Sequence, residues 1–473
     1  MMSRFKCLWL LGLLLVATQS FAAKENYHIT VKIADGNDSM LLMGNYYAKG
    51  TYALDTAYRD KNGVYTFSSS EKELHPGLYF FATGTGKFVE FVVYREKPFF
   101  SFETKDDDWM RHMVVKGSAE NECFFRFHRL RQEAAALLPP EPSRDSASYL
   151  DYRRLMERTM DSLRLDFIDK NPERMISRMM LATKEVPVPT KDPFGLPLDN
   201  QFRWKYYVTH YFDNMPLDDD FLVRTPQAVF YDRVMNYMDQ ALNGAPPEMI
   251  TPYLDTLLNR AKPSKENFKW LLHTLTEHYL QSKIMVYDAV YVHLIQEFYA
   301  KGDAWWMTPT DLESEIDRAE RWDKLLVGRI APELFLYDTL HQGHSLHRQD
   351  HDFTLLIFWS PACGHCQATI PALYEKFQNY KKKYDIQGFA ILTEFDDETV
   401  VKWKKFINEH HLDWINLNGA EANVDWHEVY DVTSTPQIYL LDRDKQILAK
   451  KLGADTFEQV MDAIIHEREA GQQ

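Results

Sequence analysis

The chain has 473 residues with 54 basic and 69 acidic side chains, which gives a formal net charge of −15. This acidic balance argues against nucleic acid and anionic membrane surfaces as partners. The length suits roughly two to four domains, and four cysteines are too few for a scaffold held together by disulfides.

The first residues predict an export signal. Basic residues at Arg4 and Lys6 precede an apolar run from Leu8 to Val16, and the stretch from Ser20 to Ala22 supplies small residues at the cleavage positions. This arrangement is typical of a secretory signal peptide covering residues 1–22. We therefore expect a soluble protein that is exported to the periplasm.

Residues 23–116 show the alternation of apolar and polar side chains that is typical of strands, most clearly from Tyr27 to Ile33. Asn62-Gly63 predicts a β-hairpin between its flanking segments, because both residues tolerate positive φ. We expect an antiparallel β-sandwich-like domain. Its expected role is docking or spacing, and binding of a ligand or peptide is the alternative.

Residues 117–328 predict an all-α middle domain. Leucines and methionines recur among charged residues from Asp151 to Met180, as they do in amphipathic helices. Thr310 and Glu313 predict a capping box for a helix that ends near Leu326. Clustered prolines separate the helical stretches.

Two further groups of residues could carry redox or metal chemistry. Cys123 lies beside Phe124-Phe125, a setting that favours a buried, inert thiol, and a regulatory partner for Cys363 is the alternative. Four histidines between residues 341 and 351 could suggest a metal, but we expect them to be surface side chains. We assign no metal site.

The segment 329–473 contains Cys363-Gly364-His365-Cys366. An apolar strand is predicted at Phe353–Trp359, and the spacing of apolar residues predicts a helix directly after the motif. The first thiol would lie at the positive end of the helix dipole, which stabilises its thiolate. One helical turn brings the second thiol within reach of a mixed disulfide on the first. Half of a zinc site is the alternative, but no second pair of suitable spacing follows.

These motifs resemble the thioredoxin superfamily, and more closely the TlpA-like thiol-disulfide oxidoreductases of bacterial envelopes. The resemblance covers residues from about Ala331 onwards and implies a C-terminal α/β thioredoxin fold, with Cys363 as the exposed nucleophile and Cys366 as the buried resolving thiol. The residues that carry it are Phe358, Trp359, Cys363, Cys366, Pro371, Thr435 and Pro436.

The resemblance also implies roles for residues around the cysteines. Thr435, followed by a cis Pro436, would pair its backbone with a substrate strand. His365 would add a cationic or hydrogen-bonding group beside the Cys363 thiolate, and the Gly364-His365 pair would shift the disulfide to the less reducing side.

Two carboxylates of the family are absent from this chain. The buried aspartate of thioredoxins is replaced by Ile357, and the glutamate of many TlpA-like reductases by Thr369. Either carboxylate would move the proton of Cys366 in the second step. Glu394 or Asp396 is a candidate substitute, and water is the alternative proton carrier.

The sequence thus predicts a periplasmic thiol-disulfide oxidoreductase that reduces or isomerises protein disulfides by dithiol exchange. It needs no cofactor beyond the redox-active Cys363–Cys366 disulfide. The expected partners are protein thiols and disulfides of the envelope, with a membrane-embedded thiol reductase as a further candidate and no nucleic acid. The alternatives are an envelope binding or scaffold protein with a vestigial or regulatory redox centre, and a thiol peroxidase.

Overall fold

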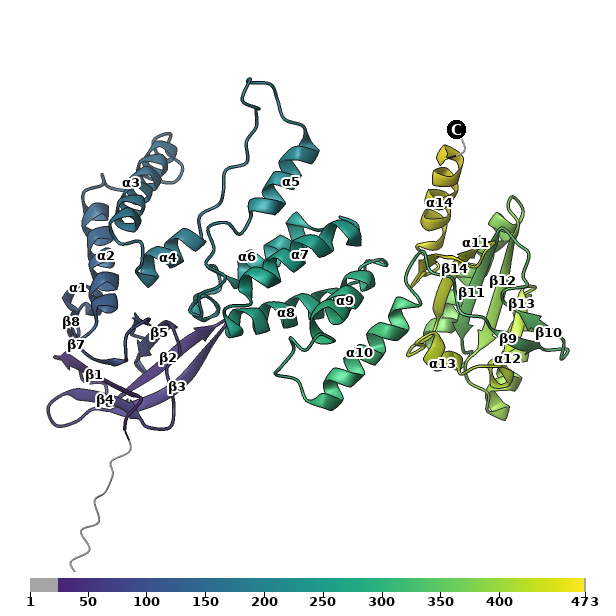
Figure 1. Cartoon of the computed structure of the whole chain (residues 1–473), viewed down its shortest axis with the longest axis horizontal. Helices are drawn as coiled ribbons and strands as arrows, with labels where there is room; N and C mark the ends of the chain where they lie inside the picture. The colour runs from purple at the N-terminus through teal and green to yellow at the C-terminus, as the bar shows by residue number, and fades with distance from the viewer. Residues whose placement is uncertain (1–23, 472–473) are drawn as a thin grey trace, which may run out of the picture. The chain divides into compact units, whose positions relative to one another are not determined.

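The computed structural model describes residues 24–471, so the predicted signal peptide at 1–22 lies outside the described residues. The chain divides into two compact units, and Figure 1 labels their helices and strands. The first contains the residues up to Leu198 together with His210–Asn236, and the second contains Asp199–Thr209 together with the residues from Tyr237 onwards. Helices of the predicted all-α region therefore occur in both units. Within the described part of the chain, no helix has the length and apolarity needed to cross a membrane.

The first unit begins with two packed β-sheets. Their strands are β1 (Tyr27–Ala34), β2 (Met40–Tyr47), β3 (Gly50–Tyr58), β4 (Val64–Ser69), β5 (Gly77–Ala82), β6 (Phe88–Val93), β7 (Phe99–Lys105) and β8 (Val114–Lys116). One sheet has the order β4-β1-β7-β8 and the other β3-β2-β5-β6. The ring of Phe81 on β5 lies 5.4 Å from that of Phe67 and 5.6 Å from that of Phe102, both on the opposite sheet. An aromatic core therefore holds the sandwich together.

The strands pair in antiparallel fashion, as predicted, except for β1 and β7, which run parallel. The hairpin predicted at Asn62-Gly63 is wrong. The turn itself is present, since the N–H of Gly63 donates to the carbonyl of Asp60 at 3.1 Å. However, β3 pairs with β2 and β4 pairs with β1. The buried side chains of Tyr65 and Phe67 draw β4 into the other sheet, so the turn connects the two sheets.

Helices follow the sandwich in the first unit. They are α1 (Trp109–His112), α2 (Ala119–Ala136), α3 (Tyr149–Lys170), α4 (Met175–Ala182), α6 (Tyr231–Asn236) and the 3₁₀ turn η1 (Leu222–Arg224). Ser118 caps α2 by accepting from the N–H of Asn121 at 3.1 Å. The side-chain amide of Asn121 then hydrogen-bonds both the N–H and the carbonyl of Val92, each at 2.8 Å. This buried amide fixes the start of α2 on the edge of β6.

The second unit begins with helices. They are α5 (Asn200–His210), whose residues up to Thr209 belong to this unit, the π-helices η2 (Tyr237–Ala241) and η3 (Ile295–Tyr299), α7 (Pro247–Ala261), α8 (Lys265–Leu280), α9 (Asp288–Leu294) and α10 (Pro309–Asp323). The predicted cap at Thr310 is wrong by two residues. The hydroxyl of Thr308 accepts from the N–H of Asp311 at 3.2 Å. Pro309 suits the first helical position because its missing N–H would have no partner there.

A seven-stranded mixed sheet completes the second unit, in the order β10-β9-β13-β12-β11-β14-β15. Its strands are β9 (Phe335–Asp338), β10 (Gly343–Ser345), β11 (Phe353–Trp359), β12 (Ile386–Leu392), β13 (Ile415–Asn418), β14 (Gln437–Asp442) and β15 (Ile447–Lys450). Its helices are α11 (Gly364–Lys381), α12 (Asp397–Glu409), α13 (Trp426–Val429), α14 (Phe457–Gly471) and the 3₁₀ turn η4 (Gly419–Glu421). The α/β fold class predicted for this segment is confirmed.

The central strand β11 is buried along its whole length. Leu355, Ile357 and Trp359 belong to one apolar cluster, which includes residues of α11 and α14. Leu356 and Phe358 alternate with them and belong to the cluster on the opposite face. A strand covered on both faces is a rigid support for the loop at its carboxyl end.

A buried ion pair joins the sheet to the helices of the second unit. Lys450 on β15 is 6% exposed and pairs with Asp288, the first residue of α9, which is 2% exposed. The ammonium group of Lys450 also donates to the carbonyl of Leu325 at 2.7 Å. Burial lowers the pKa of Lys450, while the charge of Asp288 acts in the opposite direction.

We expect Lys450→Met to destabilise the second unit by about 3–5 kcal/mol, because it leaves the buried Asp288 carboxylate without a counter-ion. Lys451→Met is the matched control, since the neighbouring lysine is exposed and its loss should cost no more than about 1 kcal/mol. Scanning calorimetry measures both changes. The Asp288→Leu/Lys450→Met double variant should recover most of the loss, and equal melting of Lys450→Met and wild type would contradict the prediction.

Candidate active site

The two cysteines of the CGHC motif lie at the start of α11, just after β11. Cys363 is the N-cap residue of α11, and its N–H donates to the carbonyl of Ser360 at 3.2 Å. Its side chain is partly exposed, whereas Cys366 is fully buried in the apolar cluster beside β11. Both thiols are free. The predicted contrast between an accessible first thiol and a buried second thiol is therefore present in the geometry.

The first turn of α11 and the Thr435 loop lower the pKa of the Cys363 thiol. Partial burial raises the pKa of this thiol, but the backbone N–H of Cys366, the side chains of Thr435 and Cys366, and the backbone N–H of His365 act against it. The net result is a Cys363 pKa below its usual value. A thiol in this position is ionised to a greater extent near neutral pH than an ordinary cysteine.

Cys366 has the opposite character. Burial raises the pKa of its thiol to about 11, against opposing hydrogen bonds from the Ser360 backbone and the Thr435 side chain. At neutral pH it stays protonated and is hidden from solvent. Of this pair, only Cys363 is placed to react first with an incoming group.

Thr435 and Pro436 lie opposite the cysteines, although 72 positions separate Thr435 from Cys363. The Cys363 thiol donates to the Thr435 carbonyl at 3.4 Å, and the Thr435–Pro436 peptide bond is cis. The pairing of β11 with β14, in which Phe358 lies opposite Gln437, brings this loop to the site. The structure thus gathers the predicted substrate-binding residues around the predicted nucleophile.

Gly364 and His365 form the first turn of α11 and are exposed. A methyl group added at Gly364 would meet no atom within 4 Å, so the packing within the chain does not require glycine here. The absence of a side chain leaves open space beside Cys363. The backbone of His365 contributes to the lowered Cys363 pKa, and its side chain lines a neighbouring pocket.

This pocket has a volume of about 850 Å³ and is lined by His365 of the CGHC motif, but by neither cysteine. His365, Thr369 and Pro436 line one side of it, and Trp322 lines it from the helical segment together with the Asp288–Lys450 pair. Trp322 is held by a 2.6 Å hydrogen bond from its indole N–H to Asp431. No local pattern around Trp322 or Asp288 connects them with residues more than 100 positions away, so these contributions could not be predicted from the sequence.

Of the two candidate proton carriers, Glu394 lies nearer the chemistry. Its carboxylate accepts from the hydroxyl of Ser360 at 3.0 Å, and Ser360 also hydrogen-bonds Cys366 through its backbone. Asp396 instead caps α12 by accepting from the N–H of Thr399 at 3.0 Å. Glu394 and water therefore stay the two candidates, and Asp396 is committed to a structural role.

Within residues 24–471, no group of three histidine, cysteine or acidic side chains is arranged to hold a metal ion. The histidines between residues 341 and 351 contact separate partners. These contacts are His341 with Glu421 at 3.4 Å, His344 with Asp338 at 3.0 Å, His347 with the Ala331 carbonyl at 2.7 Å and His351 with Asp385 at 2.7 Å.

Two family models match the chain. Residues 350–447 match a family described as thioredoxin-like, and residues 27–124 match a domain of unknown function (DUF4369). The first match contains the cysteine pair and the Thr435–Pro436 loop. The second match contains the β-sandwich and the start of α2.

Related proteins match the C-terminal segment. The thiol-disulfide oxidoreductase ResA of Bacillus thuringiensis strain Al Hakam is 25% identical over 139 residues, which are 29% of this chain and 76% of the relative. The crystal structure of a domain of a possible thiol-disulfide isomerase from Cytophaga hutchinsonii is 32% identical, covering 31% of this chain and 97% of that one, with a TM-score of 0.28. A thioredoxin-like protein from Bacteroides caccae is 19% identical, covering 59% of this chain and 98% of that one, with a TM-score of 0.46.

The unequal pKa values predict unequal alkylation of the two cysteines in the reduced protein. A thiol with a lowered pKa ionises at lower pH. At pH 7, Cys363 should therefore react with iodoacetamide more than about 100-fold faster than Cys366. The reaction of Cys366 should rise only as the pH approaches its pKa of about 11. Mass spectrometry of the cysteine peptides measures both rates, and the unfolded protein is the control, in which the rates should converge. Similar rates in the folded protein would contradict the assigned environments.

Proposed function

Because the C-terminal domain of this chain belongs to the thioredoxin superfamily, we propose that the protein is a thiol-disulfide oxidoreductase that acts on protein disulfides through Cys363 and Cys366. The observation that carries the proposal is the asymmetry of the pair. The partly exposed thiol has a lowered pKa, and the buried thiol has a raised one. A nucleophile and a resolving thiol need these two states.

The reduction proceeds in two steps of exchange. The Cys363 thiolate attacks one sulfur of the substrate disulfide, which forms a mixed disulfide and releases the other substrate sulfur as a thiolate. Cys366 then loses its proton, to Glu394 or to water, and attacks the Cys363 sulfur. The second substrate thiolate leaves, and the Cys363–Cys366 disulfide remains. Two electrons have then passed from the pair to the substrate, and the reverse sequence oxidises a dithiol.

The substrate in this proposal is a polypeptide. The free thiol of Cys363 meets the Thr435 backbone at the rim of the site, where an extended substrate segment could add hydrogen bonds to the loop. The pocket of about 850 Å³ beside it offers room for a substrate side chain next to the reacting cysteine. No cofactor beyond the cysteine pair is needed for this exchange.

We further propose that the reaction takes place in the periplasm, where protein thiols and disulfides of the envelope are the partners and a membrane-embedded thiol reductase would restore the dithiol. This part of the proposal is supported by the signal pattern in residues 1–22. Fractionation of cells that express the full chain would test it, and recovery of the protein in the cytoplasm alone would contradict it.

Turnover of insulin disulfides tests the activity. With dithiothreitol as the electron source, wild type should accelerate insulin reduction. Cys363→Ser should fall to the uncatalysed rate, because the other described thiols, Cys123 and Cys366, have raised pKa values. Cys123→Ser is the matched control and should keep full activity. Equal rates for Cys363→Ser and wild type would end the proposal.

A variant that stops after the first step should identify the substrates. Cys366→Ala cannot resolve the mixed disulfide, so it should accumulate covalent complexes that dissociate with dithiothreitol. The Cys363→Ser/Cys366→Ala double variant should accumulate none, and complexes that form equally in both would point to Cys123 or to non-specific capture.

The role proposed for the His365 side chain has its own test. If the imidazole stabilises the Cys363 thiolate, His365→Ala should raise the Cys363 pKa and make the disulfide more reducing by about 10–30 mV. Equilibration with glutathione buffers measures the potential. An unchanged potential would leave only the His365 backbone with a role in the site.

A further inference from the structure

A second pocket, in the first unit, carries a concentration of positive charge. It has a volume of about 840 Å³ and is formed by the end of α1, by β8, by the first half of α2 and by the segment that follows α3. Four arginines line it, Arg111, Arg126, Arg129 and Arg174, against a single carboxylate, Glu122. This local excess stands out in a chain whose net charge is −15.

Neutral acceptors hold two of these guanidinium groups. Arg126 donates to the side-chain carbonyl of Asn171 at 2.7 Å and to the Cys123 sulfur at 3.7 Å. Arg129 donates to the carbonyl of Met113 at 3.3 Å. These contacts fix the position of both groups without neutralising their charge. Among the described residues, neither arginine has an acidic side chain within ion-pair distance.

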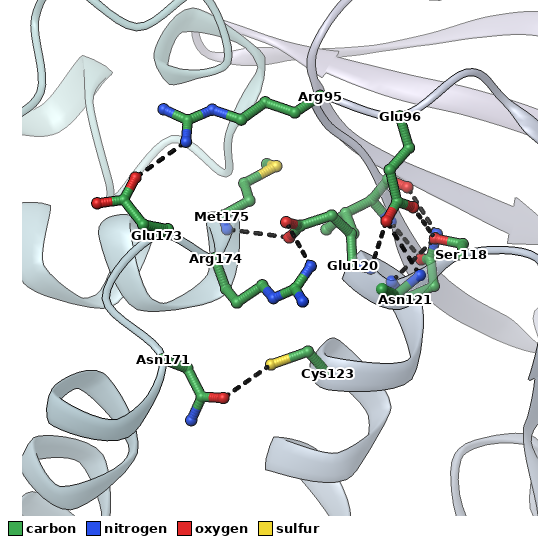
Figure 2. A network of polar contacts seen from close by, with 12 residues as sticks. Arg95, Glu96, Ser118, Glu120, Asn121, Cys123, Asn171, Glu173, Arg174 and Met175 are labelled. Atoms are coloured by element: carbon green, nitrogen blue, oxygen red, sulfur yellow. Dashed lines mark hydrogen bonds and ion pairs between the residues drawn. The ribbon is translucent and has the colours of Figure 1, made fainter.

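Two other nearby carboxylates, Glu120 and Glu96, are committed elsewhere (Figure 2). The buried Glu120 accepts from Arg174 and from the N–H of Met175, each at 3.1 Å. Glu96 accepts from the Ser118 hydroxyl at 2.7 Å and from the N–H of Ala119 at 3.1 Å. Both carboxylates thus serve the backbone at the start of α2 and α4. They compensate Arg174 in part and leave the charges of Arg126 and Arg129 to the pocket.

Cys123 also lines the pocket and forms what we call its floor. Cys123 is 6% exposed, and Figure 2 shows its sulfur directed toward Asn171. Burial raises the pKa of the Cys123 thiol, so the floor is a neutral group rather than a competing anion. Val115 and Phe125 contribute apolar wall. A ligand that fits must therefore be anionic at one end and tolerate hydrocarbon contact elsewhere.

We propose that this pocket binds a small organic anion that carries at least two carboxylate or phosphate groups. A guanidinium group donates two parallel hydrogen bonds to either group. The contacts of Arg126 and Arg129 hold both guanidinium groups in place before a ligand arrives, which lowers the entropic cost of binding. The volume exceeds the needs of one inorganic ion, and the number of uncompensated arginines calls for more than one negative charge. Neither Cys363 nor Cys366 lines this pocket.

Calorimetric titration of the full chain with citrate and with pyrophosphate tests the proposal and separates the carboxylate source from the phosphate source. We expect saturable binding of at least one of them, weakening as sodium chloride is added. Arg126→Gln and Arg129→Gln should each weaken it by about tenfold, the effect of losing one charged hydrogen bond. Arg131→Gln, on the same helix but outside this pocket, should bind as wild type does.

Thermal unfolding without ligand shows whether each variant is folded, and Cys363→Ser/Cys366→Ala should bind with unchanged affinity. The proposal is overturned if neither anion binds saturably, if folded Arg126→Gln binds like wild type, or if Arg131→Gln loses as much affinity as Arg126→Gln. Binding of a poly-glutamate peptide in the absence of binding of either small anion would also overturn it, in favour of a protein partner.

Discussion

The candidate site depends on the position of one sulfur atom at the positive end of a helix. Cys363 caps α11, so the free N–H groups of the first turn face its sulfur and lower its pKa. Three features of the fold fix the surroundings of this atom. The buried strand β11 fixes the start of the loop, the pairing of β11 with β14 brings Thr435 to the other side, and the apolar cluster holds Cys366 beneath it.

The helical segment takes part in the site of the second unit, although the cysteine chemistry could be described without it. Asp288 forms a buried pair with Lys450, and Trp322 hydrogen-bonds Asp431. The first contact joins α9 to β15 and the second joins α10 to the segment before β14, and the residues of both line the same pocket as His365. The helices therefore shape the pocket that His365 lines.

The secondary structure around the cysteines could be predicted where a local pattern has a local cause. The bounds of β11 follow from a run that is apolar except for Thr354. The position of Cys363 at the start of α11 follows from the helical spacing of apolar residues after the motif. Prediction from the sequence failed where contacts between distant residues override a local signal. Asn62-Gly63 turns the chain as expected, but the burial of Tyr65 and Phe67 decides which strand β4 joins.

Other features had no signal that a single sequence could give. The Asp288–Lys450 pair joins residues far apart in the chain, and their types alone favour solvent. The arginines around Cys123 look like ordinary surface charges of an amphipathic helix. Only the three-dimensional arrangement shows that Glu120 faces Met175 and that Asn171 holds Arg126. The spacing of arginines along α2 could have suggested a charged face, but not a pocket.

The parallel pairing of β1 with β7 has a consequence for how the chain matures. His28 lies opposite Phe99, and β1 is an inner strand of its sheet. A chain that emerges with its N-terminus first must therefore wait for most of the sandwich before this strand gains both neighbours. Until then one edge of β1 is open, and an open strand edge can pair with another chain and aggregate. The first strand of the domain thus keeps an unpaired edge until β7 has formed.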